Sequence, residues 1–176
     1  MLDSQSGKHV PIAFLLTQVG SGAAKKFAKA LEPLQFVPSD AGLLRLLARS
    51  PGISQRELAA RLDTHASRLV GVIDGLEKRG LVTREPNAED RRVYSLHLSG
   101  AGREALAAIG AVARAHNEEI CSGLTDAERE QLGAVLQRVA DRLGLRHGIH
   151  PGYSDLGKHS ADFYSGQSDD HQARHK

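Results

Sequence analysis

Small, polar and basic side chains share one face of a helix that the sequence predicts over residues 64–79. At about 100° per residue, the apolar side chains fall on one narrow face, which we expect to be buried: Leu69, Ile73 and Leu76. The opposite, exposed face holds Thr64, Ser67, Gly71, Asp74 and Lys78, with Arg68 at its flank. His65 falls about 40° from the centre of the apolar face, so we expect it to be partly buried rather than to contact a base. Such a face suits the major groove of DNA. Ser67 and Arg68 are the predicted base contacts, since an arginine can donate two hydrogen bonds to guanine, and Gly71 would let the backbone approach closely. An ordinary solvated helix face with one arginine is the alternative for this segment alone.

Two more groups of polar residues suit the phosphate backbone of a nucleic acid. Ser54, Gln55 and Arg56 open another predicted helix, where backbone N–H groups and an arginine can hold a phosphate. Ser54 and Glu57 also have the spacing of a capping box, and capping by Ser54 is compatible with phosphate binding. Arg91 and Arg92 lie at the tip of a predicted hairpin, where they suit a minor groove or its flanking phosphates.

The elements that position these residues follow from periodicity and from capping residues. Helices are predicted over 11–31, 38–50, 54–62 and 64–79, the last one ended by Gly80, and longer helices over 99–122 and 125–143. Strands are predicted over 81–85 and 92–98, joined by a polar turn into a hairpin. Two helices joined by a short turn and followed by a hairpin with a basic tip form a winged helix-turn-helix. The predicted fold class is therefore mainly α, with a small β-hairpin wing.

The composition narrows the class of protein. The chain has 176 residues, of which 40% are hydrophobic and 25% charged, as in a soluble globular protein. Its single cysteine, Cys121, excludes an internal disulfide, and we expect a buried, inert thiol. The absence of Trp disfavours base stacking on an aromatic platform. The apolar run at 10–16 contains Pro11 and continues with helical spacing. We therefore expect no cleaved signal, no membrane span and a cytoplasmic protein.

Charge and motif content limit the remaining functions. Residues 53–103 hold nine Lys and Arg against seven Asp and Glu, so DNA binding requires the basic groups to share one face. No Walker loop, G-x-S-x-G or H-E-x-x-H motif occurs, and we predict neither an enzyme nor a cofactor.

The tail from Gly144 holds five of the nine histidines. The pairs His147/His150 and His171/His175 have possible metal spacing, but a loose His-rich segment without cysteine is not expected to form a functional metal site. Three aromatic residues in the tail predict that part of it docks on the folded protein: Tyr153, Phe163 and Tyr164.

Three segments together resemble the multiple-antibiotic-resistance regulator (MarR) family. They are residues 51–62 (PGISQRELAARL), 69–82 (LVGVIDGLEKRGLV) and 89–103 (EDRRVYSLHLSGAGR). The segments occur in the order and spacing of the family, and the likeness covers roughly residues 10–143.

The resemblance implies a dimeric transcriptional regulator whose first, fifth and sixth helices form the dimer interface. Family members usually bind pseudo-palindromic operators, and many are released by a small ligand, often phenolic, or by thiol oxidation. The sensing cysteine of that family lies in the first helix, which has none here, so redox sensing does not carry over to Cys121. Asp90 and Arg92 match the pair that braces the wing in the family, so Asp90 is predicted to be a brace, and one of the two wing arginines is predicted to be structural.

The sequence thus predicts a homodimeric, ligand-responsive repressor that binds double-stranded DNA. Its expected divisions are an N-terminal dimerisation helix (1–35), a winged-helix DNA-binding lobe (36–98), C-terminal dimerisation helices (99–143) and a tail (144–176). The effector pocket is expected where the dimerisation helices meet the lobe, although the sequence names neither its residues nor its ligand. The alternative is a winged helix used as a protein-interaction module, without an operator.

Overall fold

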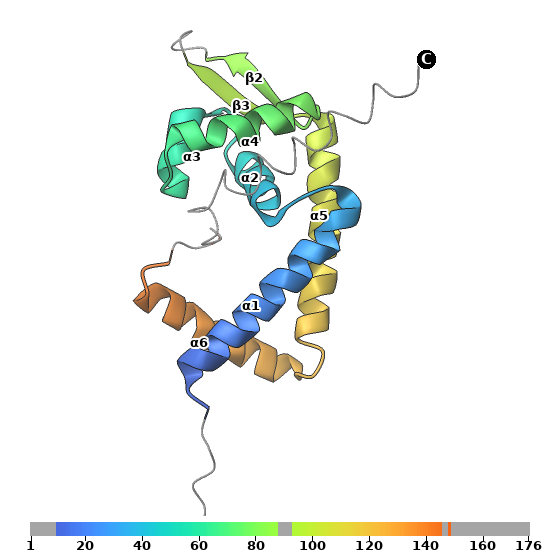
Figure 1. Cartoon of the computed structure of the whole chain (residues 1–176), viewed down its shortest axis with the longest axis vertical. Coiled ribbons are helices and arrows are strands. Elements are labelled where there is room, and N and C mark those ends of the chain that lie inside the picture. The colour runs from blue at the N-terminus through green and yellow to red at the C-terminus, as the bar shows by residue number, and fades with distance from the viewer. Residues whose placement is uncertain (1–9, 88–92, 146–147, 149–176) are drawn as a thin grey trace, which may run out of the picture.

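The computed structural model describes residues 10–87, 93–145 and 148. These residues are mostly helical, and their elements divide between two ends of the molecule (Figure 1). Helices α2, α3 and α4 and a small sheet form a lobe at one end. Helices α1 and α5 extend from that lobe side by side, and α6 follows α5 at the other end of the molecule.

A proline marks the start of each of the first two helices, and α1 begins one residue after its predicted start at Pro11. Helix α1 spans Ile12–Leu31 with Pro11 as its N-cap, and α2 spans Pro38–Arg49 with Pro38 in its first turn. A proline suits these positions because its missing N–H has no partner there in any case. A short 3-10 helix, η1 (Glu32–Leu34), joins the two and ends at Gln35, whose φ of 57° is left-handed.

Helices α3 (Gln55–Leu62) and α4 (Ala66–Lys78) form the predicted helix-turn-helix. The predicted start of α4 at Thr64 is wrong by two residues. Asp63 adopts a left-handed conformation (φ 52°) that ends α3, Thr64 is still in the turn, and His65 is the extended N-cap of α4. The predicted end is confirmed, since α4 stops at Lys78 and Gly80 follows with a φ of 70°.

The predicted hairpin is present, and a third strand joins it. Strands β2 (Val82–Pro86) and β3 (Tyr94–Leu98) pair antiparallel, with Val82 opposite Leu98. The short strand β1 (Ile53–Ser54) pairs with the other edge of β3, giving the order β1-β3-β2. The sequence analysis missed β1 because two residues are too few to show alternation. β1 ties the start of α3 to the wing.

The last two helices follow their predicted caps. Helix α5 (Gly100–Ile120) begins at Ser99, and α6 (Asp126–Arg142) begins with the capping box of Thr125 and Glu128. One cluster of buried apolar side chains runs from Leu31 at the end of α1, through α2, α3, α4 and the sheet, to Ile109 of α5. The lobe therefore shares its core with the two long helices that extend from it.

The other end of the molecule leaves large apolar side chains exposed. On α1 these are Ile12, Phe14, Leu15, Leu16 and Val19, and on α6 they are Leu132, Val135 and Leu136. No residue of α6 is buried, although its apolar residues recur with helical spacing. Among the described helices, none is both long enough and apolar enough to cross a bilayer.

Candidate nucleic-acid interface

The start of α3 is fixed by hydrogen bonds that leave Ser54 little freedom. Its hydroxyl donates to Glu57 Oε2 over 2.7 Å and accepts from the Glu57 N–H over 3.2 Å, and its own N–H donates to Glu57 Oε2 over 2.9 Å. These bonds, first from the hydroxyl and then from the backbone, lower the pKa of the Glu57 carboxyl. The predicted capping box is thus confirmed. Ser54 is buried within it, so its hydroxyl already has partners other than a phosphate.

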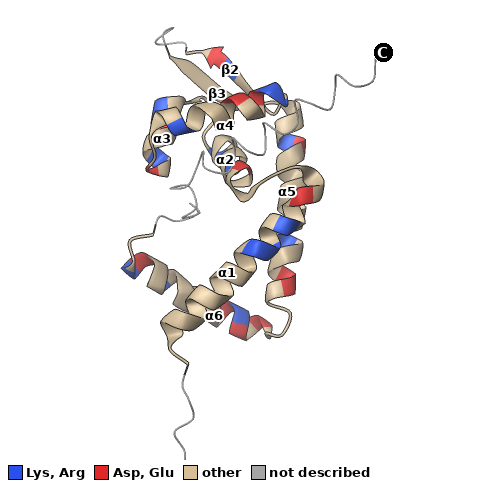
Figure 2. Cartoon of the chain, in the orientation of Figure 1, with Lys and Arg blue, Asp and Glu red and all other residues tan. Residues whose placement is uncertain are grey.

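The two residues after Ser54 have different roles. Gln55 is half-buried, and its Nε2 donates to the backbone oxygen of Ala66 over 3.2 Å, which ties the first turn of α3 to the first turn of α4. Arg56 is exposed beside it. Basic residues lie along α3 (Figure 2). An exposed guanidinium on the first turn of a helix is well placed for a phosphate.

Helix α4 presents the exposed face that the sequence predicts. Leu69, Val72, Ile73 and Leu76 are buried, whereas Ser67, Arg68, Gly71 and Lys78 are exposed. A Cβ added at Gly71 would meet nothing within 4 Å, so the backbone here is open to an approaching molecule. The structure therefore brings four of the predicted residues together on α4, with Arg56 nearby on α3.

The turn before α4 differs from the prediction. The helical wheel placed Thr64 on the exposed face, but Thr64 precedes the helix and its Oγ1 is buried without a hydrogen-bond partner among the described residues. The same wheel predicted partial burial for His65, which is instead exposed. Both predictions fail because neither residue lies within the helix, and we leave Thr64 out of the proposed DNA contacts.

The wing is fastened to α4 by Arg84, a residue that the sequence analysis missed. The guanidinium of Arg84, on β2, forms ion pairs with both Asp74 and Glu77 of α4. Asp74 was predicted to lie on the exposed face, but it is half-buried in this contact. Two carboxylates three residues apart on a helix, followed by an arginine in the next strand, are the signal that could have revealed it. The predicted wing residues Asp90, Arg91 and Arg92 lie outside the described residues.

Val70 is a second residue that the sequence analysis missed. Its side chain is 42% exposed, and it lies on α4 one turn after Ser67. The helical-wheel analysis considered the polar residues and the buried apolar residues of α4. Val70 belongs to neither group, because it is apolar and exposed.

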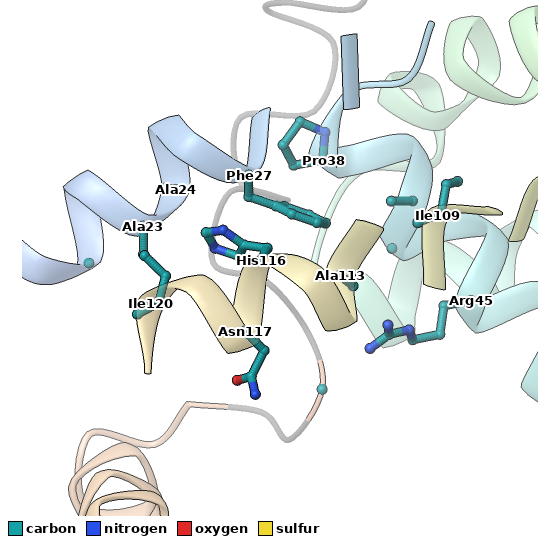
Figure 3. A pocket seen from close by; sticks show the side chains of 14 residues that line it. Ala23, Ala24, Phe27, Pro38, Arg45, Ile109, Ala113, His116, Asn117 and Ile120 are labelled. Atoms are coloured by element: carbon teal, nitrogen blue, oxygen red, sulfur yellow. The ribbon is translucent and has the colours of Figure 1, made fainter. Parts of the chain in front are cut away.

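A cavity of about 510 Å³ lies where α1, α2 and α5 meet. That is the junction at which the sequence analysis expected an effector pocket, and the volume is that of a small-molecule site. Figure 3 shows Phe27 and His116 side by side at one part of the wall, and Arg45 of α2 at another. The rings of Phe27 and His116 are 5.4 Å apart between centroids. The Nδ1 atom of His116 is buried and has no hydrogen-bond partner among the described residues.

Helix α2 also contacts the end of α4 from its other face. Asp40 is fully buried, and its Oδ2 lies 3.8 Å from Nη1 of Arg79, the residue that ends α4. The same guanidinium lies 4.2 Å above the ring of Phe36, a cation–π contact. Helix α2, which lines the cavity, is therefore in direct contact with Arg79, the C-cap residue of α4.

Outside the lobe, α1 and α5 are held together by charge as well as by packing. Basic residues of α1 lie beside α5 (Figure 2), and Lys26 donates a hydrogen bond to Glu119. This contact holds the pKa of the Glu119 carboxyl below its usual value. Cys121 is half-buried at the end of α5, so the expectation of a buried thiol is wrong for the single chain. The described residues contain no cluster of metal-ligating side chains, and the predicted tail pairs lie outside them.

Comparisons with known proteins agree on one family. The model of the MarR family matches residues 35–93. The transcriptional regulatory protein assigned to the hcr operon of Thauera aromatica is 34% identical over 129 residues, which cover 73% of this chain and 78% of that protein. The structure of the transcriptional repressor CouR bound to a 23-mer DNA duplex has a TM-score of 0.66 and 28% identity, and the match covers 80% of this chain and 99% of that one. The Mycobacterium tuberculosis MarR-family protein Rv2887, in complex with salicylic acid, has a TM-score of 0.60 and 27% identity, with coverage of 75% and 98%.

Proposed function

The chain belongs to the MarR family of transcriptional regulators, and we propose that it is a homodimeric repressor that binds a pseudo-palindromic operator and leaves it when a small ligand binds. The exposed face of α4 is the observation that carries the proposal. This face is small, polar and basic at its N-terminal half, its opposite face is the core of the lobe, and the wing fixes its orientation. The likeness to CouR, a repressor bound to duplex DNA, supports the same assignment.

Within this proposal the residues divide by what they contact. Ser67 and Arg68 reach base edges in the major groove, where Gly71 allows close approach, and Lys78 contacts a phosphate. Gln55 and Arg56 hold the backbone at the start of α3. Arg91 reaches the neighbouring minor groove or its phosphates, and Asp90 and Arg92 form the bracing pair of the wing that the family resemblance implies.

The exposed apolar faces of α1 and α6 form the dimer interface of the proposal, together with α5. A single chain leaves large apolar side chains on both helices in contact with water, and pairing with a second copy would bury them. Two copies related by a two-fold axis present two α4 helices. Half-sites of the operator are then centred about 10 base pairs apart or a multiple of that distance.

The cavity between α1, α2 and α5 is the proposed ligand site. Its wall offers aromatic rings from Phe27 and His116, a buried nitrogen of His116 that has no hydrogen-bond partner among the described residues, and a guanidinium from Arg45. These groups suit a small aromatic anion, and the related protein Rv2887 has been solved with salicylic acid. A ligand that separates α2 from α5 would move Asp40 and, through Arg79, the end of α4. The dimer would then shift between two spacings of its α4 helices, only one of which fits the operator.

Selection of bound fragments from random duplex DNA, using the purified full-length protein, tests DNA binding. We expect an inverted repeat, bound with an affinity that falls steeply as salt rises, because each phosphate contact releases counterions. Absence of a selected sequence would contradict the proposal and favour a protein-interaction module. A selected site without an inverted repeat would contradict the dimer.

Analytical ultracentrifugation of Leu136→Asp tests the dimer interface directly. A buried, unpaired carboxylate at the proposed interface should shift the protein to monomer and remove operator binding. The exposed Glu130→Gln substitution on the same helix is the control and should leave the dimer intact.

Two alanines of α5 provide a matched test of the ligand site. Ala113 lines the cavity, whereas Ala111 is exposed and does not. With salicylate as the probe, we expect release of the wild-type protein and of Ala111→Leu from the operator. Ala113→Leu fills the cavity and should still bind the operator but no longer respond. An equal response in both variants would place the ligand elsewhere.

A further inference from the structure

Val70 differs from the other exposed residues on the helices of the proposed DNA-binding lobe in being both large and apolar. Within α2, α3 and α4, all of which the structure describes, it is the only exposed large apolar side chain. The other exposed large apolar residues described here lie in or beside α1, α5, α6 and the strand β3. A β-branched residue is also a poor helix former, so the helix itself gains nothing from valine at an exposed position.

The position of Val70 places its methyl groups beside the predicted base contacts. At about 100° per residue, Val70 is some 60° from Ser67 and 40° from Asp74 around α4, outside the buried strip. It also lies about 3 Å further along the helix axis than Arg68, close to the rise of one base pair. Gly71, directly after it, has no side chain to hold the helix away from the bases.

The chemistry of the major groove offers one partner for such a side chain. Hydrogen-bond donors and acceptors line the base edges, and the C5-methyl group of thymine is the apolar exception. Valine has no polar atom to donate or accept, so it distinguishes thymine from cytosine by contact with this methyl group.

We infer that Val70 is a specificity-determining residue that recognises the C5-methyl group of one thymine in each half-site of the operator. The inference rests on the proposed function, because it requires α4 to enter the major groove. The thymine lies within two base pairs of the position that Arg68 reads.

Replacing thymine by deoxyuridine removes this methyl group and nothing else, which gives an atomic test. Each thymine of the selected operator is replaced in turn, and affinity is measured for the wild-type protein, Val70→Ala and Lys78→Ala. For the wild type we expect one replacement per half-site to weaken binding about fourfold, the loss expected when one apolar carbon group gives up its contact. Val70→Ala should bind the thymine operator about fourfold more weakly per half-site and should not distinguish thymine from uracil at that position.

A control variant and the possible negative results distinguish recognition of the methyl group by Val70 from a general loss of DNA binding. Lys78→Ala should weaken binding to all these duplexes alike and keep the wild-type sensitivity to uracil, because a phosphate contact does not sense the methyl group. Val70→Ala should be at least as stable as the wild type, since alanine favours a helix more than valine does. The inference is overturned if Val70→Ala remains as sensitive to uracil as the wild type, or if the wild type is not sensitive to uracil at all. In either case, binding to the selected operator would still support the proposed function. Failure to select any duplex overturns both.

Discussion

Arg84 of the wing strand β2 is ion-paired with Asp74 in the middle of α4, and the same guanidinium also pairs with Glu77 one turn later. Arg84 is 21% exposed, whereas Asp74 and Glu77 are 42% and 38% exposed, so the contact is only partly shielded from water. It joins the two elements that are proposed to enter neighbouring grooves, and it compensates two carboxylates that would otherwise face DNA phosphates.

Substitution of Arg84 should therefore weaken DNA binding without changing the sequence preference. In Arg84→Gln the two carboxylates are uncompensated, and their repulsion of nearby phosphates should lower affinity roughly fivefold for specific and unspecific duplexes alike. The measurement is a fluorescence-anisotropy titration at several salt concentrations. The triple variant Asp74→Asn, Glu77→Gln, Arg84→Gln removes the carboxylates as well and should recover most of the affinity. If it binds as weakly as Arg84→Gln, the role of Arg84 is to orient the wing rather than to compensate charge.

We expect Arg68→Ala and Arg91→Ala to change different properties of DNA binding, the first the sequence preference and the second the affinity for all sequences. Arg68 is exposed on the first turn of α4, and loss of a bidentate base contact should cost ~1–3 kcal/mol and relax the preference at one position of each half-site. Arg91 is predicted to contact phosphate, so its loss should weaken all sequences alike and reduce the dependence of affinity on salt. Repeating the fragment selection with each variant checks both statements. The same change of profile in both variants would show that at least one residue has been assigned wrongly.

Two glycine-to-alanine substitutions should change stability in opposite directions. A Cβ at Gly102, in the first turn of α5, would lie 2.0 Å from the backbone oxygen of Leu81, so Gly102→Ala should destabilise the fold by ~1–3 kcal/mol or more. Gly71 has open space and lies within α4, so Gly71→Ala should stabilise the chain by ~0.5–1 kcal/mol through helix propensity. Urea unfolding measures both. Gly71→Ala should nevertheless weaken operator binding, because the added methyl group holds α4 away from the bases, and unchanged affinity would contradict its placement in the groove.

The two capping boxes should make stability depend on pH in the acid range. Bonds from Ser54, first its hydroxyl and then its N–H, lower the pKa of Glu57, and bonds from Thr125, first its N–H and then its hydroxyl, lower the pKa of Glu128. A carboxyl whose pKa is lower in the folded chain stabilises the fold fully above its unfolded pKa. That contribution disappears as the pH falls through the lowered, folded-state pKa.

The corresponding experiment compares the wild type with the double variant Glu57→Gln, Glu128→Gln. Urea midpoints measured from neutral to acid pH should fall less steeply in the variant, which has no carboxylate at these caps to protonate. Glu130→Gln, on the exposed surface of α6, is the control and should follow the wild-type curve. Parallel curves for all three proteins would mean that the caps do not contribute to acid sensitivity.

The sequence by itself determined the local elements and which face of α4 is exposed. Local contacts set the helix ends at Ser54, Thr125 and Gly80 and the buried strip of α4. These contacts join residues that are three or four positions apart, so they can be read from the sequence. The hairpin is equally local, because its two strands are close neighbours along the chain. For the same reason, the helical periodicity of this segment was sufficient to predict that Ser67, Arg68 and Gly71 are neighbours on one side of α4.

Only the tertiary structure decided how distant segments meet. The pairing of Ile53 with Leu96, the contact between Asp40 and Arg79, and the cavity wall formed by Phe27 and His116 each join residues about forty or more positions apart. Which of many polar residues become partners then depends on the packing of whole helices, and periodicity carries no information on that choice. The predictions for Thr64 and His65 were wrong for a related reason. A single left-handed residue, Asp63, ends α3 there, and the geometry of the turn, not the helical wheel, determines which side chain is buried.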